Sequence, residues 1–288
     1  MRGSPAWHSE GVSDTSREFV DDDDPLEEEE VPLHLREIGK IPSTALYISE
    51  PFRGIADVSL MQIARPLLKR APDGDGHGVL VLPGLLASDT STAPLRRFLR
   101  EHNYYVRGWR LGRNIGPSEA ILAGLPQATS DLVERTGGPV SVVGWSLGGI
   151  YARHLALNHP TLVRQVITLG SPFGIAHGHR TRADSAFERL RIIHARPRIM
   201  PDRSRIADAL SVPSTSLYSR MDGVVPWRAC VGPDTELHQN VEVRCSHLGF
   251  GFDPASIWCV ADRLSRPVED WQRFSPPAIA RRLYRNIG

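Results

Sequence analysis

The sequence predicts an α/β fold in which a mostly parallel β-sheet is flanked by helices. Between residues 78 and 266, short apolar runs alternate with stretches of helical length that carry apolar residues on one face. The first run, at 78–84, is continuously apolar and ends in glycine, as expected of a parallel strand buried on both faces. With 288 residues, of which 41% are hydrophobic, the chain is long enough for one large core.

The expected strands and helices follow one another in a regular order. Strands are predicted at residues 78–84, 104–111, 139–146, 162–172, 214–220 and 240–246. Helices are predicted at residues 90–103, 117–138, 147–160 and 253–266. Since the crossover connections between parallel strands are right-handed, this alternation favours a single, largely parallel sheet.

Three segments lie outside this alternation. Residues 1–30 form a polar tail whose run of Asp and Glu opposes compaction, so we expect disorder or, alternatively, an acidic arm for a basic partner or metal ions. Residues 56–70 predict an amphipathic helix that breaks near Pro66. Residues 173–212 are too long for a simple connection, which indicates a helical cap or lid inserted into a domain that spans 31–288.

The composition argues against several classes of protein. A formal net charge of +1 disfavours a nucleic-acid partner, which needs a basic face. The 3 cysteines lack the spacing of a zinc site or a disulfide framework, so buried thiols are expected, with one bridge left open. No apolar run approaches the ~20 residues of a membrane-spanning helix. The first residues lack the apolar segment of a secretory signal, which predicts a cytoplasmic location.

A candidate nucleophile lies where a predicted strand meets a predicted helix. The segment Gly144-Trp145-Ser146-Leu147-Gly148 matches the pattern G-x-S-x-G. So tight a strand-to-helix turn holds the serine in a strained backbone and projects its hydroxyl from the sheet edge. Glycines flank the serine because a Cβ at either position would collide with the neighbouring strand or helix. The alternative is an ordinary glycine-rich turn.

A serine hydroxyl needs an adjacent base to act as a nucleophile at neutral pH. His247 is the best candidate among the 11 histidines because it directly follows the last predicted strand and so lies at the expected sheet edge. The rival histidines are on a helix, in the insertion or near the opposite edge of the sheet: His77, His154, His159, His177, His179, His194 and His238.

Asp222 is the candidate acid that would orient the imidazole. It follows a predicted strand and precedes a glycine, so its alternative role is to form a turn. The order Ser146, Asp222, His247 along the chain is the order in which a triad occurs on this kind of parallel sheet. Asp208 and Asp253 are the alternative acids.

Acyl transfer also needs two backbone N–H groups that stabilise the charge developing on the carbonyl oxygen of the substrate. Leu147, directly after the serine, would supply one, and Leu85, in the loop after the first predicted strand, would supply the other. Apolar residues near the expected site predict contacts with an apolar substrate group: Leu86, Trp145, Phe173 and Trp227. The alternative is that these side chains only pack.

Four segments together resemble the α/β-hydrolase superfamily, and specifically its bacterial lipase- and esterase-like members. They are LPGLLAS, GWSLGG, SRMDGVVPW and CSHLGFG, and the stretch at 108–120 is also similar to one that these proteins carry. Ser146, Asp222 and His247 match the nucleophile, acid and base of that family, and Leu85 and Leu147 match its oxyanion-hole positions.

The chain departs from this family in two respects. Pro83 stands before Gly84, where the family usually has histidine, so a polar contribution from that position is missing. No leading pair of antiparallel strands is evident before residue 78, where the sequence has a helical pattern instead. The second difference concerns the number of strands and not the residues of the expected site.

The resemblance implies an α/β-hydrolase fold and a serine esterase or lipase that works through an acyl-enzyme, with no metal and no organic cofactor. The expected partner is a small-molecule or lipid ester, and the oligomeric state is left open. Two other functions stay open. One is an acyltransferase that uses the same triad, and the other is a catalytically inactive binding module on this fold.

Overall fold

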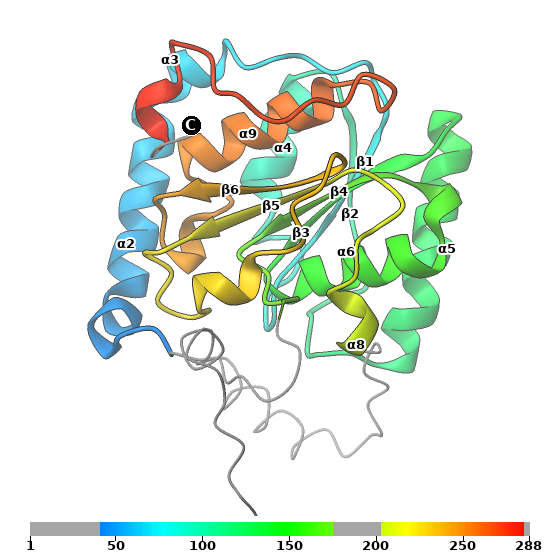
Figure 1. Ribbon diagram of the computed structural model, residues 1–288, viewed down its shortest axis with the longest axis horizontal. Coiled ribbons are helices and arrows are strands. Elements are labelled where there is room, and N and C mark those ends of the chain that lie inside the picture. The colour runs from blue at the N-terminus through cyan, green and yellow to red at the C-terminus, as the bar shows by residue number, and fades with distance from the viewer. Residues whose placement is uncertain (1–40, 175–202, 285–288) are drawn as a thin grey trace, which may run out of the picture. The chain divides into compact units, whose positions relative to one another are not determined.

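The computed structural model describes residues 41–174 and 203–284, and within them six strands form one sheet (Figure 1). All neighbouring strands are parallel, in the order β2-β1-β3-β4-β5-β6, so the mostly parallel sheet is confirmed. The strands are β1 (Gly78–Leu82), β2 (Tyr105–Gly108), β3 (Val140–Trp145), β4 (Val163–Leu169), β5 (Ser214–Ser219) and β6 (His238–Val243).

Helices cover both faces of this sheet (Figure 1). Successive side chains of a strand point to opposite faces. Val79 and Val81 therefore join the core layer beneath α4 and α9, whereas Leu80 and Leu82 join the layer beneath α5 and α6. The four helices are α4 (Ala93–Glu101), α5 (Glu119–Thr136), α6 (Leu147–Asn158) and α9 (Pro254–Ser265).

A long helix precedes the sheet along the chain. The structure has α2 (Thr44–Ile63) and α3 (Arg65–Leu68) where one helix with a break was predicted at 56–70. The break near Pro66 is confirmed. Its physical cause is that proline has no N–H to continue the helical hydrogen bonds. The predicted start was wrong: the helix begins much earlier, after Ser43, whose hydroxyl accepts an N–H of the first turn.

Helix α2 lies at the carboxyl ends of β5 and β6, where the loops after these strands contact it (Figure 1). A Cβ on Gly54 would be 3.1 Å from Leu248 Cβ in the loop after β6. A Cβ on Gly223, in the loop after β5, would lie 2.5 Å from the backbone of Leu46. Because residues 41–77 hold no strand, this helix takes the place in the chain where the resemblance had suggested a strand pair.

Residues 1–30 and 175–202 lie outside the described residues, so the acidic tail and most of the cap insertion stay predictions. At the downstream end of that insertion the structure has α8 (Arg203–Ile206). The thiols of Cys230, Cys245 and Cys259 are all buried and unpaired, as expected. Within the described part of the chain, none of the helices combines the length and the apolar composition that crossing a membrane requires.

Candidate active site

Ser146 lies at the turn between β3 and α6, with φ 53° and ψ −121°. A positive φ is unfavourable for a residue with a side chain, so this turn holds backbone strain. The N–H of Ser146 donates to Leu169 O at 2.8 Å, which ties the turn to β4. A Cβ on Gly144 would overlap the backbone of Gly148, and a Cβ on Gly148 would overlap the backbone of Leu82. The turn therefore requires both glycines.

The side chains of Ser146, His247 and Asp222 form one hydrogen-bonded row. His247 Nε2 lies 3.1 Å from Ser146 Oγ, and His247 Nδ1 lies 2.6 Å from Asp222 Oδ2. Since a carboxylate only accepts, Nδ1 carries the hydrogen and Nε2 is left to accept the serine proton. The N–H groups of Val224 and Val225 donate to Asp222 Oδ1 at 2.8 and 2.7 Å, which holds the carboxylate in place.

The surroundings of His247 favour its protonated form. Burial lowers the pKa of this imidazole, but the charge of Asp222, the hydrogen bond to it and the charge of Glu50 outweigh burial, so the pKa lies above the ordinary value of 6.5. Both Asp222 and His247 are buried, at 3% and 6% exposed. An imidazolium formed by taking a proton from the serine would therefore be stabilised by two carboxylates.

The ends of β5 and β6 bring the acid and the base to the serine. Asp222 follows β5, and His247 opens a short 3₁₀ turn after β6. The hydroxyl of Ser219 donates to Cys245 O at 2.7 Å and joins the two strand ends. The indole N–H of Trp145, one residue before the serine, donates to His247 O at 3.1 Å. The positions of all three side chains are thus set by neighbouring parallel strands.

The loop after β1 passes directly beside the serine. A Cβ on Gly84 would be 3.2 Å from Ser146 Cβ, so only glycine allows this approach without displacement. The next residue, Leu85, lines the same cavity as Ser146. Leu147 is the first residue of α6, so its N–H has no partner one turn earlier in the helix. The structure therefore brings both predicted oxyanion-hole residues to the serine.

Asn114 holds this loop and was not recognised in the sequence. The backbones of Asn114 and the loop exchange two hydrogen bonds, Leu86 N–H to Asn114 O at 2.6 Å and Asn114 N–H to Ala87 O at 2.8 Å. The side-chain amide donates to Pro83 O at 2.9 Å and accepts from the hydroxyl of Tyr151 at 3.3 Å. Asn114 lies within the stretch 108–120, but no spacing rule distinguished it from the neighbouring polar residues.

A cavity of about 550 Å³ opens onto the row, with Ser146 and His247 in its wall. The remaining wall is mostly apolar, and much of it comes from α2 and the loop after β1. Its apolar lining includes Ile48, Pro51, Leu86, Trp145, Val224 and Leu248. Such a wall suits a ligand that places an apolar group beside Ser146.

Two of the four predicted substrate contacts line this cavity and two do not. Leu86 and Trp145 belong to its wall. Phe173 is 2% exposed and packs beneath the guanidinium of Arg153, 4.1 Å from its ring centroid. Trp227 stacks on Tyr218 with ring centroids 5.4 Å apart. Neither Phe173 nor Trp227 lines this cavity, because each ring packs against another partner.

Three of the rival candidates have other partners. His77 lies between Asp75 and Ser141, and His238 contacts Thr235. Asp253 caps the first turn of α9. His177, His179 and His194 lie outside the described residues. Within residues 41–174 and 203–284, His247 is the one histidine within hydrogen-bonding distance of Ser146.

Glu50 and Asp57 of α2 both contact the loop that carries His247, and the sequence analysis recognised neither. Glu50 is 3% exposed and accepts from His247 N–H at 3.1 Å, and Asp57 accepts from Ser246 N–H at 3.1 Å. Their seven-residue spacing places them on one helix face. This spacing could have predicted a shared role for the two carboxylates, but only if the helix had been predicted to begin before residue 50.

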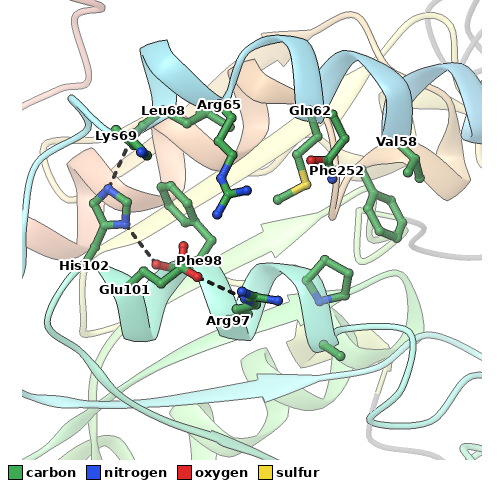
Figure 2. A pocket seen from close by; sticks show the side chains of 13 residues that line it. Val58, Gln62, Arg65, Leu68, Lys69, Arg97, Phe98, Glu101, His102 and Phe252 are labelled. Atoms are coloured by element: carbon green, nitrogen blue, oxygen red, sulfur yellow. Dashed lines mark hydrogen bonds and ion pairs between the residues drawn. The ribbon is translucent and has the colours of Figure 1, made fainter.

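A second cavity, of about 430 Å³, lies between α2, α3 and α4 and shares no lining residue with the first. Figure 2 shows Arg65 reaching from α3 toward Phe98 of α4 across this space. None of the predicted site residues lines it. Within the described residues, no group of three or more His, Cys, Asp or Glu side chains is placed to hold a metal ion.

A model of the family described as "Alpha/beta hydrolase family" matches residues 79–285 of this chain. The matched region contains Ser146, Asp222 and His247, as well as both oxyanion-hole candidates. It begins after α2, so the helix that contributes Glu50 and Asp57 lies outside the match.

The solved structures to which this chain shows similarity include three hydrolytic enzymes. Aspergillus fumigatus lipase B is 15% identical, and the alignment covers 67% of this chain and 53% of the lipase, with a TM-score of 0.52. A pyrethroid hydrolase from Sphingobium faniae JZ-2 is 17% identical over 67% of this chain and 99% of its own, with a TM-score of 0.47. A metagenome-derived lipolytic enzyme is 18% identical over 67% and 93%, with a TM-score of 0.48. At such identities the likeness to the lipase indicates a shared fold alone.

Proposed function

The chain belongs to the alpha/beta hydrolase family, and from this premise we propose that it is a serine hydrolase that cleaves carboxylic esters. One observation carries the proposal. His247 lies 3.1 Å from the hydroxyl of Ser146 through one ring nitrogen and 2.6 Å from Asp222 through the other. This is the arrangement in which an imidazole activates a serine and a carboxylate orients the imidazole.

In the first half of the reaction, Ser146 Oγ attacks the ester carbonyl carbon while His247 Nε2 takes the hydroxyl proton. The carbonyl electron pair moves onto the oxygen, which accepts hydrogen bonds from the N–H groups of Leu85 and Leu147. When this intermediate collapses, the bond to the alcohol oxygen breaks and His247 gives its proton to that oxygen. An acyl group is left on Ser146.

In the second half, a water molecule attacks the acyl carbon while His247 removes one of its protons. The bond to Ser146 Oγ then breaks, and the proton returns to the serine. The products are the carboxylic acid and the free enzyme. Each step needs only the three side chains and the two N–H groups.

The cavity supports an ester with an apolar group as the substrate. Its wall beside Ser146 is built from Leu86, Leu248 and other apolar residues, and its volume of about 550 Å³ is within the range of small-molecule sites. An ester is favoured over an amide because an alcohol leaves more easily than an amine. The same row could transfer the acyl group to an alcohol if water were excluded, so acyl transfer is an outcome of the test.

The test is labelling with a fluorophosphonate probe, followed by hydrolysis of p-nitrophenyl esters of increasing acyl length. We expect the wild-type protein to be labelled and the Ser146→Ala variant to be neither labelled nor active. Adding an alcohol acceptor separates hydrolysis from acyl transfer by the products formed. A folded wild-type protein that is not labelled would reject the catalytic proposal and favour a binding module.

A further inference from the structure

The loops that carry the proposed acid and base both contact one buried carboxylate from outside the matched family region. Glu50 lies on α2, whereas Asp222 and His247 follow β5 and β6. A buried carboxylate is unfavourable unless hydrogen-bond donors surround it. The donors around Glu50 therefore indicate what it does.

Glu50 accepts hydrogen bonds from both loops at once. Its Oε1 accepts from Gly223 N–H at 2.7 Å, next to the proposed acid, and from His247 N–H at 3.1 Å. Its Oε2 accepts from Leu248 N–H at 3.2 Å. Arg53, one turn further along α2, lies 2.7 Å from Oε1. Since all four partners are donors, the side chain acts as a carboxylate.

Arg53 extends the same connection. Its guanidinium donates to Met221 O at 2.5 Å, beside the proposed acid, and to Leu46 O at 2.8 Å in the first turn of α2. Gly223 also packs directly against the backbone of Leu46. The loop after β5, which carries Asp222 (the acid loop), and the loop after β6, which carries His247 (the base loop), are therefore joined to each other through one side of α2.

We propose that Glu50 is a positioning residue that keeps the acid loop and the base loop in register and stabilises the imidazolium form of His247. This role rests on the proposed function of the Ser146, His247 and Asp222 row. A displaced imidazole loses reactivity steeply, because its ring nitrogen must stay within hydrogen-bonding distance of the hydroxyl. Glu50 restrains the backbone N–H of the histidine itself.

The charges around His247 agree with this role. Asp222, in the loop after β5, contacts the imidazole itself, whereas Glu50 of α2 accepts from the backbone N–H of His247 and has Arg53 beside it. Burial lowers the pKa of His247, whereas the charges of Asp222 and Glu50 raise it above its ordinary value. Removing the charge of Glu50 should therefore lower that pKa and leave Asp222 as the main opposing influence.

Asp57 provides a matched comparison on the same helix. It is also buried, and its Oδ2 accepts from Ser246 N–H at 3.1 Å and from Ser246 Oγ at 2.6 Å. These bonds reach the base loop and not the acid loop. Replacing Asp57 thus removes a buried carboxylate from the same helix while the connection through Glu50 stays in place.

The experiment compares wild type, Glu50→Gln, Glu50→Asp and Asp57→Asn. The imidazole of His247 is titrated by NMR, with its signal assigned from its loss in His247→Asn, and kcat and KM are measured across pH. In Glu50→Gln we expect a lower titration midpoint for His247, an equal displacement of the acid limb of kcat/KM, and a fall in kcat of roughly 10- to 100-fold. KM should change little.

Glu50→Asp keeps the charge on a shorter side chain, so its midpoint should stay near that of wild type while kcat falls. Asp57→Asn should lower the melting temperature and leave the His247 midpoint in place. An unchanged midpoint together with an unchanged kcat in Glu50→Gln would overturn the proposal. If that variant does not fold, Glu50→Asp decides, and wild-type kcat in it would be the overturning result.

The titration needs no substrate, so the two proposals can fail separately. Suppose that the protein shows no ester hydrolysis that depends on Ser146, but that Glu50→Gln still lowers the titration midpoint of His247. That result would reject the proposed function and retain the link between Glu50 and His247. Ester hydrolysis that is lost in Ser146→Ala but unaffected by Glu50→Gln would retain the function and reject the positioning role.

Discussion

The side-chain amide of Asn114 donates a hydrogen bond to Pro83 O at 2.9 Å and so joins the loop after β2 to the loop after β1. The backbone of Asn114 bonds to both Leu86 and Ala87 of the same loop. Asn114 is fully buried. The loop that carries Leu85 is therefore held by one residue on both sides of the proposed oxyanion donor.

Asn114→Ala should impair this loop. The change leaves Pro83 O and the Gly116 N–H without their side-chain partner, at a cost of about 1–3 kcal/mol for each buried group. A displaced Leu85 N–H should lower kcat by roughly 100-fold, with a smaller effect on KM. The checks are ester kinetics and the melting temperature. Lower stability with wild-type kcat would show that Asn114 has no influence on the oxyanion hole.

Asp222→Asn should abolish most activity without unfolding the protein. An amide at this position no longer fixes the hydrogen of the imidazole on Nδ1, so His247 is held less often as a base toward the serine. We expect kcat to fall by roughly 10⁴-fold. Asp253→Asn is the control, because Asp253 caps α9 and makes no contact with His247. Equal losses in the two variants would contradict the assignment of the acid.

The activity should rise with pH through a single ionisation above 6.5, the ordinary histidine value, because the neutral imidazole of His247 is the proposed base and its pKa is raised. The proton on His247 affects the stability of the fold in the opposite direction: activity rises as this proton is lost, whereas stability falls. Since the folded protein binds it more tightly than the unfolded chain, it stabilises the fold at low pH, and this contribution is lost as pH rises through the raised pKa. Measurements of kcat/KM from about pH 5 to about pH 9 test the first point, and comparison with His247→Asn by denaturation tests the second.

Asp253 should make stability depend on pH. Burial raises its pKa from 3.8 to about 6. The folded state therefore holds this proton where the unfolded chain has lost it, so the stabilisation present below 3.8 disappears as pH rises to about 6, a loss of about 3 kcal/mol. Asparagine caps a helix equally well, so Asp253→Asn should remove this slope. Urea denaturation at several pH values is the check, and an equal slope in both proteins would refute it.

Leu86→Trp should narrow the cavity and shift the preference toward short esters. Leu86 lines the wall beside Ser146. We expect kcat/KM for long acyl chains to fall by roughly 10-fold or more while short esters are spared. Trp227→Phe is the matched control, since Trp227 stacks on Tyr218 and does not line the cavity. If kcat/KM fell equally for all acyl chain lengths, Leu86 would not contribute to recognition of the acyl chain.

Local sequence patterns were sufficient for the sheet and for the order of the proposed triad. Each expected strand is present. The residues of β1 and β3 are buried and mostly apolar, as a parallel strand covered on both faces requires, and this pattern can be read from the strand alone. Strands β5 and β6 instead carry several buried polar residues. Ser146 was recognisable because a turn this tight demands glycines at fixed spacing. Asp222 and His247 were found by their places after β5 and β6.

Contacts between distant segments were not available from such patterns. Phe173 and Trp227 are aromatic and close in sequence to the expected site, yet their rings stack on Arg153 and Tyr218. Nothing local to Glu50 indicates that a backbone N–H of residue 247 lies 3.1 Å away.

The sequence by itself determined the order of the strands along the chain, the strained turn at Ser146, and the presence of a serine, an acid and a histidine at the ends of strands. Each of these features depends on residues a few positions apart. Only the tertiary structure decided that α2 lies at the carboxyl ends of β5 and β6 and places Glu50 between Gly223 and His247. The physical reason is that hydrogen bonds and packing act over a few ångströms in space, whatever the separation along the chain.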